Sequence, residues 1–323
     1  MRAVVVEEYG SPEVLVVREM PEPEPGPGEV SITVGFVGVN FTDVRNRVGD
    51  GLGVLPFVPG VEASGTVRKL GPGVEGLRPG QPVAAFTRGE AYAEVTTAQA
   101  ALTVPLPDGL AGRPESAGMM VALPVAILLL RSVGRVTPGE LVLVHSAAGG
   151  VGTALGQLAR LGGLRPLLGT VGHPDKAGLA REHGYSTVCG YDDFDTAVLE
   201  ETAGRGVDVV LDPVGGEVRA RSFELLAPFG RLVSYSNISR EPERIPDTNW
   251  LRARCIGCIG FSGGQLSART PLAMRPALEE AVSLVASGDV TIPVTSVFQL
   301  ADATKAHEIF ERRAASGKLV LEV

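Results

Sequence analysis

The sequence predicts an α/β protein in which a doubly wound parallel sheet is joined to a second, β-rich domain. Three observations carry this prediction. A strand-like run at residues 141–144 breaks into a glycine-rich turn and continues as an amphipathic helix. From about residue 119 onward strand and helix patterns alternate, whereas the first 118 residues show short strands between Pro/Gly clusters.

The composition is that of a soluble globular protein, and 323 residues are enough for two domains with substantial cores. The 29 Lys and Arg stand against 37 Asp and Glu, and the formal charge of −8 argues against a nucleic-acid partner. The first six residues lead directly into Glu7 and Glu8, so no export signal is expected. The longest apolar run, residues 119–130, contains Pro124 and is shorter than the roughly 20 residues of a membrane span. We therefore expect a cytoplasmic protein with no membrane partner.

Three cysteines, Cys189, Cys255 and Cys258, fit a reducing cytoplasm better than a disulfide framework. The last two form a C-x-x-C pair inside an apolar segment. Such a pair could be a redox pair or half of a metal site, but no second pair or nearby His completes a zinc set. We expect two buried thiols and no bound metal.

Residues 145–152 read HSAAGGVG, which is typical of a dinucleotide-binding turn between a strand and a helix. The glycines let the backbone turn tightly and approach a pyrophosphate, whose charge is stabilised by the N–H groups at the start of the helix. Ala147 stands at the first glycine position of the usual G-x-G-x-x-G, so a glycine-rich structural turn is the alternative. The residues predicted to contact the cofactor are Ala148, Gly149, Gly150, Val151 and Gly152.

The chain after the next predicted strand favours NADPH over NADH. NAD-preferring folds place Asp or Glu about twenty residues beyond the turn, on the ribose 2′-hydroxyl. Here residues 167–173 carry no carboxylate. Gly172 would leave room for a 2′-phosphate, and Lys176 on the following helix could reach it as a point charge. The alternative for Lys176 is a solvated side chain on an exposed helix face.

The remaining elements follow from hydrophobic periodicity and turn residues. In the first domain, strands are predicted at residues 14–18, 29–37, 65–70, 82–86 and 92–96. In the second, strands are predicted at 141–144, 167–171, 187–189, 207–211 and 231–234, with helices at 152–161 and 174–183. Beyond residue 263 we expect a helix at 276–286, a strand at 290–298, a helix at 301–315 and a strand at 318–323, which return to the first domain.

Several segments together resemble the medium-chain dehydrogenase/reductase superfamily, and within it the zinc-free quinone oxidoreductase group with its zeta-crystallin-like and enoyl-reductase-like members. The matching segments are residues 38–43, 55–62, 89–94, 145–152, 206–212, 214–216 and 317–321, in family order over nearly the whole chain. The resemblance implies a GroES-like catalytic domain formed by residues 1–118 and 263–323, and a Rossmann domain formed by residues 119–262. It also implies a homodimer.

The zinc ligands of related dehydrogenases are absent from the sequence. Zinc-dependent relatives place a Cys at the position of Asn40 and a His at that of Val61, and carry four cysteines after the segment near Phe86. Glu62 alone cannot hold a metal, because a catalytic zinc needs about three protein ligands. The resemblance therefore implies a zinc-independent reductase that transfers hydride from NADPH to a quinone or an α,β-unsaturated carbonyl. An enoyl-thioester reductase and a non-catalytic NADPH-binding protein are the alternatives.

Two residues are predicted to be catalytic. Asn40 could donate a hydrogen bond to a substrate carbonyl or bind the nicotinamide amide, and its alternative is an Asx-type loop bond. Arg45 stands where many relatives have Tyr, and it could stabilise an enolate or point to solvent. Asp43 is expected to fix this loop through backbone N–H groups. Pro124 belongs to a segment where relatives often read Gly-x-Thr-Ala, and it should kink or interrupt its helix.

The resemblance assigns further residues to the cofactor: Tyr191 near the adenosine phosphate, Ser236 and Asn237 along the pyrophosphate and nicotinamide, Phe261 over the nicotinamide, and Lys318 in the closing segment. For Tyr191 a half-buried core position is the alternative, and for Phe261 an apolar strand position. Residues 255–261 resemble the edge strand through which family members pair as dimers.

Overall fold

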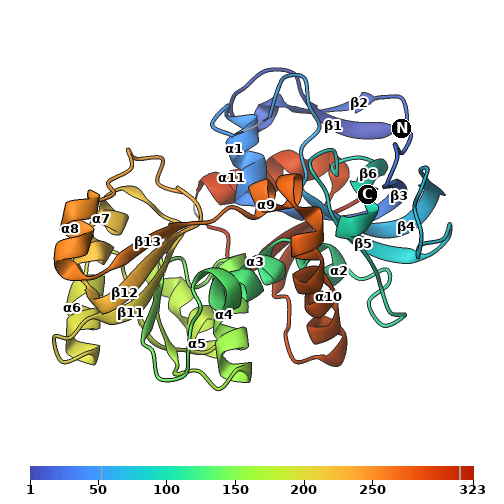
Figure 1. The fold of residues 1–323 in the computed structure, drawn as a ribbon. Helices are drawn as coiled ribbons and strands as arrows, with labels where there is room; N and C mark the ends of the chain where they lie inside the picture. The colour runs from blue at the N-terminus through green and yellow to red at the C-terminus, as the bar shows by residue number, and fades with distance from the viewer. Residues whose placement is uncertain (52, 313) are drawn as a thin grey trace. The chain divides into compact units, whose positions relative to one another are not determined.

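The computed structural model describes residues 1–51, 53–312 and 314–323, and its internal contacts divide it into two compact units (Figure 1). Unit 1 comprises Met1–Pro124 and Gly264–Val323, and unit 2 comprises Val125–Gly263. The boundaries predicted from the sequence, after residues 118 and 262, lie a few residues away from these. The assignment of catalysis to one domain and of cofactor binding to the other stays a prediction.

Unit 2 is built on a six-stranded parallel sheet. Its strands are β8 (Val142–Val144), β9 (Leu167–Thr170), β10 (Tyr185–Cys189), β11 (Val207–Asp212), β12 (Leu226–Ser234) and β13 (Gly257–Gly260). They lie in the order β10-β9-β8-β11-β12-β13, and every neighbouring pair is parallel. This is the strand order of a doubly wound dinucleotide-binding sheet, so the predicted fold class is confirmed. The winding reverses between β8 and β11, and ligands of such sheets bind beside this point at the carboxyl ends of the strands.

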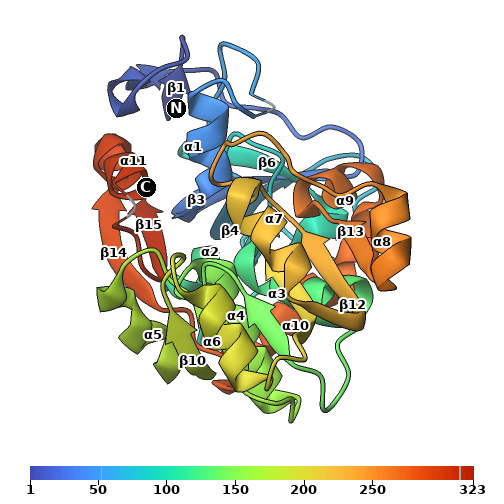
Figure 2. The same ribbon diagram turned by 90° about the vertical axis from the view of Figure 1, so that its left-hand side faces the viewer.

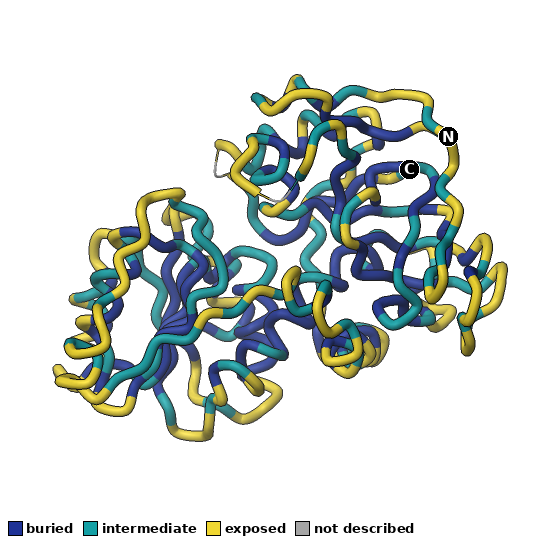
Figure 3. Tube along the Cα trace, turned by 45° about the horizontal axis from the view of Figure 1, so that its top comes forward, coloured by how far each residue is buried: buried dark blue, intermediate teal, exposed yellow. Residues whose placement is uncertain are grey.

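Helices connect the strands of this sheet. They are α4 (Gly150–Leu161), the 3-10 turn η4 (Pro174–Lys176) with α5 (Ala177–Glu182), α6 (Phe194–Glu201), α7 (Gly216–Glu224) and α8 (Thr248–Arg254). Apolar strand residues such as Leu143, Leu168 and Leu232 form the core, which appears dark blue in Figure 3. Where one helix was predicted from residue 174, the chain first makes a 3-10 turn. β10 and β12 both begin earlier than predicted.

The segment that leads into unit 2 is interrupted. It contains α2 (Glu115–Gly118), α3 (Ala122–Leu128) and a π-helical turn, η3 (Leu129–Val133). The turn at residues 119–121 lies directly before α3, and Pro124, the third residue of α3, has no N–H to donate to the carbonyl of Met120, so the predicted interruption is confirmed. By length and composition Glu115–Val133 is a candidate membrane span, which corrects the shorter run taken from the sequence. However, 72% of its most apolar stretch is buried in the fold, as in the core helix of a soluble protein.

Unit 1 contains a seven-stranded mixed sheet. Its strands are β3 (Glu29–Val39), β4 (Glu62–Leu70), β5 (Pro82–Phe86), β6 (Val95–Gln99), β7 (Thr103–Pro105), β14 (Val294–Gln299) and β15 (Lys318–Glu322). The strands β4, β6 and β15 each pair antiparallel with β3, so the end of the chain returns to the first sheet. A separate pair is formed by β1 (Arg2–Val6) and β2 (Leu15–Glu19). Figure 2 shows α11 (Ala303–Glu311) beside β14 and β15.

Several predicted elements of unit 1 are displaced in the structure. The strand predicted at residues 92–96 was wrong in position, because Tyr92 and Ala93 bond to β1 while β6 starts at Val95. The helix α10 (Pro271–Ser287) begins earlier than predicted. Pro271 occupies its first turn, where a missing N–H costs no intrahelical bond, and Pro276 lies inside the helix.

Other elements of unit 1 are shorter than expected or were not expected. They are α1 (Phe41–Arg47), α9 (Gly263–Arg269) and the 3-10 turns η1 (Pro12–Val14), η2 (Ala100–Leu102) and η5 (Leu300–Asp302). The short helix α1 replaces the loop expected around Asp43. The predicted helix 301–315 corresponds to η5 and α11, and its residue 313 lies outside the described residues.

Candidate functional site

The glycine-rich turn lies where the sheet order places a ligand. The strand β8 ends at Val144, Ser146 adopts a positive φ of 62°, and α4 begins at Gly150. A Cβ on Gly152 would lie 2.5 Å from the backbone oxygen of Ala147, so only glycine lets the helix start this close to the turn. The predicted residues Ala148, Gly149, Gly150, Val151 and Gly152 all lie in this turn and in the first turn of α4. The first N–H groups of a helix have no intrahelical acceptor, and this helix of 12 residues offers them to an anion.

The ends of β9 and β10 carry Gly172, predicted beside a 2′-phosphate, and Tyr191, predicted near the adenosine phosphate. Gly172 follows β9 and is exposed, and the nearest atom to a Cβ built on it is Cε2 of Tyr191, at 3.8 Å. Lys176 is half-buried in η4, and this burial lowers the pKa of its ammonium. The structure thus brings Gly172 and Tyr191 together, with Lys176 on the element that follows.

His145, which sequence analysis treated only as part of the turn, ties the strand ends together. It is fully buried, and its ring nitrogens lie 2.9 Å from Thr170 Oγ1 and 2.8 Å from Ser222 Oγ. Ser222 donates its hydroxyl hydrogen to the Val218 carbonyl, so Nε2 of His145 carries the proton and Nδ1 accepts from Thr170. Burial lowers the pKa of His145 to about 4, which keeps the ring neutral at physiological pH.

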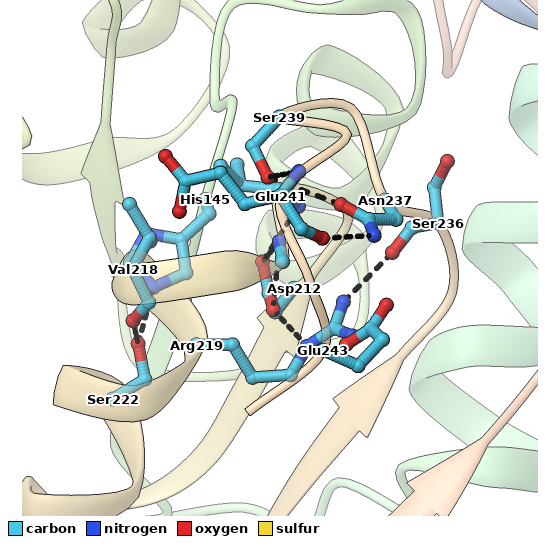
Figure 4. Close-up of polar contacts among 12 residues, drawn as sticks. His145, Asp212, Val218, Arg219, Ser222, Ser236, Asn237, Ser239, Glu241 and Glu243 are labelled. Carbon is cyan, nitrogen blue, oxygen red and sulfur yellow. Dashed lines mark hydrogen bonds and ion pairs between the residues drawn. The ribbon is translucent and has the colours of Figure 1, made fainter. Parts of the chain in front are cut away.

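A buried ion pair stands at the carboxyl ends of β11 and β12 (Figure 4). Arg219 on α7 donates from Nε to Asp212 Oδ2 at 2.6 Å and from Nη2 to the Ser236 carbonyl at 2.7 Å, and its third nitrogen contacts Glu243. Both Arg219 and Asp212 are fully buried. Asp212 Oδ1 also accepts from the Val214 N–H at 2.6 Å. The guanidinium therefore holds the loop that follows β12 against the start of α7.

This loop carries two of the residues assigned to the cofactor. Ser236 is held through its carbonyl, and Asn237 donates from Nδ2 to the Glu241 carbonyl at 2.9 Å while its Oδ1 accepts from Ser239 at 3.0 Å. The Asn237 amide thus shapes its own loop (Figure 4). Phe261 follows β13, is half-buried and donates its N–H to the Ser234 carbonyl at 2.9 Å. All three residues lie at the same edge of the sheet as the glycine-rich turn.

In unit 1 the strand register brings Asn40, Glu62 and Lys318 together. Ala63 pairs with Val37 and Leu319 with Val39, so the antiparallel neighbours β4 and β15 both begin beside the end of β3. Nδ2 of Asn40 donates to Glu62 Oε1 at 2.8 Å, and its Oδ1 accepts from Lys318 Nζ at 2.8 Å. Lys318 also forms an ion pair with Glu62, and both side chains are buried.

Asp43 has the structural role that the sequence predicts. Its carboxylate accepts the Asn40 N–H at 2.8 Å and the Gly60 N–H at 3.2 Å. It is fully buried, and burial raises its pKa to about 7. The hydroxyl of Tyr92 lies 3.4 Å from this carboxylate and 3.1 Å from His307 Nε2, and burial lowers the pKa of His307 to about 3. Sequence analysis missed Tyr92 and His307, because they lie far from Asp43 in the chain and form no motif with it.

Arg45 is held by its own loop. Its Nη2 donates to the Asp50 carbonyl at 2.7 Å, and its Nε lies 3.4 Å from the Asp50 carboxylate. The side chain is 30% exposed and bonds an exposed residue of its own loop, so the solvent-facing alternative stays a prediction as well. Contact of Arg45 with a ligand stays a prediction.

Within the described ranges there is no group of three or more His, Cys, Asp or Glu side chains that could hold a metal ion. The prediction of two buried thiols was wrong for Cys255, which is exposed at the end of α8, while Cys258 is half-buried in β13. Cys255 follows the last helical residue and adopts a positive φ of 55°, as the C-cap of α8.

Two family models match the chain. Residues 26–120 match the alcohol dehydrogenase GroES-like domain, and residues 183–321 match a model described as zinc-binding dehydrogenase. Together they cover parts of both units.

Curated and solved proteins agree with these matches. A quinone oxidoreductase of Pseudomonas aeruginosa is 35% identical over 97% of both chains. A 2-haloacrylate reductase of a Burkholderia species is 30% identical over 99% of this chain and 98% of its own. The crystal structure of the Escherichia coli quinone oxidoreductase complexed with NADPH superposes with a TM-score of 0.91, at 31% identity and full coverage of both chains.

Proposed function

The chain belongs to the medium-chain dehydrogenase/reductase superfamily, among its quinone oxidoreductases, and from this premise we propose that it transfers hydride from NADPH to a quinone or an α,β-unsaturated carbonyl without a metal. It is an oxidoreductase of this superfamily. The observation that carries the proposal is the glycine-rich turn at the reversal point of a doubly wound sheet, where Gly152 lets α4 approach a pyrophosphate.

NADPH is the proposed cofactor because a small residue and a cation follow β9, and residues 167–173 carry no carboxylate for a ribose 2′-hydroxyl. The exposed Gly172 without a side chain and the Lys176 ammonium in η4 together favour a 2′-phosphate. When bound, NADPH supplies the hydride from its nicotinamide ring. The loop held by Arg219 and the aromatic ring of Phe261 would then orient that ring for transfer.

Zinc does not fit the residues present, although one matching model is described as zinc-binding. Asn40 and Val61 stand where zinc-dependent relatives have Cys and His. The carboxylate of Glu62 is already paired with the ammonium of Lys318, which would repel a divalent cation. Activation of the acceptor would therefore come from hydrogen bonds and fixed charges, which stabilise the oxygen anion that forms during hydride transfer.

The test is NADPH oxidation with a panel of acceptors. We expect turnover of 1,2-naphthoquinone or of a simple enone, and retention of activity after treatment with a metal chelator. Crotonyl-CoA and an acyl-carrier enoyl thioester distinguish the alternative of a thioester reductase, and binding of NADPH with turnover of no acceptor would identify a non-catalytic protein. Stoichiometric zinc that is lost together with activity would overturn the metal-free mechanism.

We further propose a homodimer formed through the edge strand β13. This strand is the last in the order of the parallel sheet and is paired on one side with β12. Its sequence, GCIG, carries none of the charges that commonly protect a free edge. Sedimentation at several concentrations would show a dimer, and Ile259→Lys would shift it towards the monomer.

A further inference from the structure

We infer that Arg219 is a positioning residue: by binding the Ser236 carbonyl, it fixes the peptide between Ser236 and Asn237 so that this peptide offers the bound cofactor a backbone N–H donor. This inference rests on the proposed function, because the cofactor is taken to lie along the carboxyl ends of the parallel strands. The residues that carry it all belong to unit 2.

The loop after β12 contains two backbone N–H groups without an acceptor. On either side of them, the N–H groups of Tyr235 and Ile238 donate to the carbonyls of residues 212 and 213, at 3.0 Å and 2.9 Å. Within the described part of the chain, the N–H groups of Ser236 and Asn237 donate to no carbonyl and to no side chain. Both residues are only half-buried, so this stretch of backbone is not sealed in the core.

Arg219 determines which way the peptide between Ser236 and Asn237 faces. Its Nη2 donates to the Ser236 carbonyl at 2.7 Å, and its side chain is only 1% exposed. The peptide is trans, and in a planar trans peptide the C=O and the N–H that follows it point in opposite directions. The Asn237 N–H therefore points away from the buried guanidinium.

The reverse orientation of this peptide is excluded by charge. A rotation of its plane by 180° would turn the Asn237 N–H towards the guanidinium, so that two donors would meet and Nη2 would lose its acceptor. An unpaired buried donor of a charged group is costly. The guanidinium cannot follow the rotation, because Nε donates to Asp212 Oδ2 at 2.6 Å and the third nitrogen binds Glu243 (Figure 4). The buried ion pair thus sets the polarity of the peptide.

The side chain of Asn237 holds the other end of the same peptide. Its Nδ2 donates to the Glu241 carbonyl at 2.9 Å, and its Oδ1 accepts from Ser239 Oγ at 3.0 Å. A Cβ on Gly215, which has a φ of 83°, would lie 2.9 Å from Asn237 Cγ, so glycine is needed here for this amide to pack against the start of α7. The Asn237 backbone is therefore fixed on both sides of its N–H.

The acceptor that fits this donor is a neutral oxygen of the nicotinamide half of the cofactor. Leu211 of β11 pairs with Val144 of β8 on one side and with Val233 of β12 on the other, so the glycine-rich turn and this loop leave the sheet two strands apart. Two strand spacings separate them by roughly 10 Å. With the pyrophosphate at the start of α4, the groups that can reach the loop are a ribose hydroxyl and the carboxamide oxygen.

The experiment compares the wild type with Arg219→Met and the double variant Arg219→Met/Asp212→Asn. Dissociation constants are measured for three compounds. They are NADPH, 2′-phospho-ADP-ribose, which lacks the nicotinamide ring, and adenosine 2′,5′-bisphosphate, which lacks the whole nicotinamide mononucleotide half. We expect both variants to bind NADPH about three- to tenfold more weakly than the wild type, the size of one hydrogen bond. Their affinity for adenosine 2′,5′-bisphosphate should stay within about twofold of the wild type.

The double variant separates positioning from stability. Arg219→Met leaves the Asp212 carboxylate buried without a counter-charge and should lower Tm. Asp212→Asn removes that charge and keeps an oxygen for the Val214 N–H, so the double variant should recover most of the lost Tm while its affinity for NADPH stays low. Arg254→Met, at an exposed ion pair with Glu224, is the matched control and should change neither quantity.

The outcomes are distinct. A double variant that regains both Tm and wild-type affinity for NADPH would show that Arg219 is merely structural and would overturn the inference, as would an equal loss of affinity for adenosine 2′,5′-bisphosphate. A loss shared by NADPH and 2′-phospho-ADP-ribose supports the inference and assigns the acceptor to the ribose, whereas a loss confined to NADPH assigns it to the carboxamide. Failure of the wild type to bind NADPH at all would overturn the proposed function, and this inference with it.

Discussion

Each of the two units buries an ion pair next to residues of the candidate site. The pair in unit 2 fixes a backbone loop, whereas the pair in unit 1 contacts the side chain of one residue. In unit 2, Arg219 spreads three contacts over Asp212, Glu243 and the Ser236 carbonyl, and so fixes a stretch of backbone. In unit 1, the single nitrogen of Lys318 bonds Glu62 and the side chain of Asn40. The planar guanidinium of arginine presents several donors in fixed directions, so it can bind several groups along a loop. The ammonium of lysine is a compact charge, and here it binds one carboxylate and one amide.

The largest expected effect comes from breaking the arginine pair. Arg219→Met leaves Asp212 buried without a counter-charge and frees the Ser236 loop, so we expect a loss of about 3–5 kcal/mol in the free energy of unfolding. Urea denaturation measures this loss. Arg244→Met, at an exposed pair with Glu217, is the control, and its stability should stay within about 0.5 kcal/mol of the wild type. Equal effects of the two variants would show that burial does not distinguish these pairs.

The next effect concerns pH. Burial lowers the pKa of His145 to about 4, so between its ordinary value near 6.5 and pH 4 the unfolded chain binds a proton that the folded chain does not. Stability should therefore fall as the pH falls through this window, by on the order of 3 kcal/mol from His145. In His145→Gln this part of the slope should vanish. An unchanged slope between pH 6.5 and pH 4 would contradict the buried neutral ring.

Asp43 in unit 1 has the opposite effect on the pH dependence of stability. Burial raises its pKa to about 7, so the folded chain holds a proton that the unfolded chain has released above about pH 4. Its contribution is greatest in acid and is lost as the pH rises towards 7. Asp43→Asn should therefore flatten a decline of stability over that range. Comparison of the two variants by thermal unfolding from pH 4 to pH 8 tests both signs at once.

A smaller effect is expected at the nucleotide turn. Gly152→Ala forces a methyl group against the Ala147 carbonyl, and we expect a loss of about 1–3 kcal/mol in stability together with weaker NADPH binding. The control is Gly178→Ala in α5, where a Cβ meets no atom within 4 Å among the described residues. There the gain in helix propensity should stabilise the protein by up to about 1 kcal/mol. If the two variants bound NADPH with similar affinity, the glycine-rich turn would not be part of the cofactor-binding site.

The smallest effect is expected at Arg45. Its contacts are with the exposed Asp50, so Arg45→Ala should cost less than about 1 kcal/mol of stability and leave kcat/KM within about threefold of the wild type. Steady-state kinetics with the best quinone acceptor provides the measurement. A loss of more than tenfold would instead place the guanidinium on the substrate.

Sequence patterns predicted the local parts of the molecule well. The glycine-rich turn, the alternation of strands and helices and the doubly wound sheet all depend on residues close together in the chain, where periodicity and turn chemistry act directly. The interruption before Pro124 was also predictable, because proline lacks the N–H that the helix needs. The boundaries of β6, α10 and α11 were displaced, since these depend on which neighbouring strand or turn completes the hydrogen bonds.

The polar clusters could not be assembled from the sequence. Lys318 was assigned to the cofactor by its motif, but its bonds to Glu62 and Asn40 follow from the antiparallel register on both sides of β3. Arg219 and His145 gave no signal of their own, because single charged residues on a helix or after a strand are normally solvated or structural. Asp43 was the exception, since its bond to the Asn40 N–H spans only three residues.

The bond between Asn40 and Lys318 joins residues 278 positions apart, and all of unit 2 is synthesised between them. A ribosome therefore completes unit 2, whose strands are contiguous in the chain, before β15 exists to pair with β3. Throughout that interval Lys318, the ammonium partner of Glu62 in the folded protein, has not yet been synthesised. Pairing between segments so far apart in the chain is slow, because the entropy of closing the long loop must be lost first. Pairing of β15 with β3 would therefore limit the rate at which unit 1 completes folding.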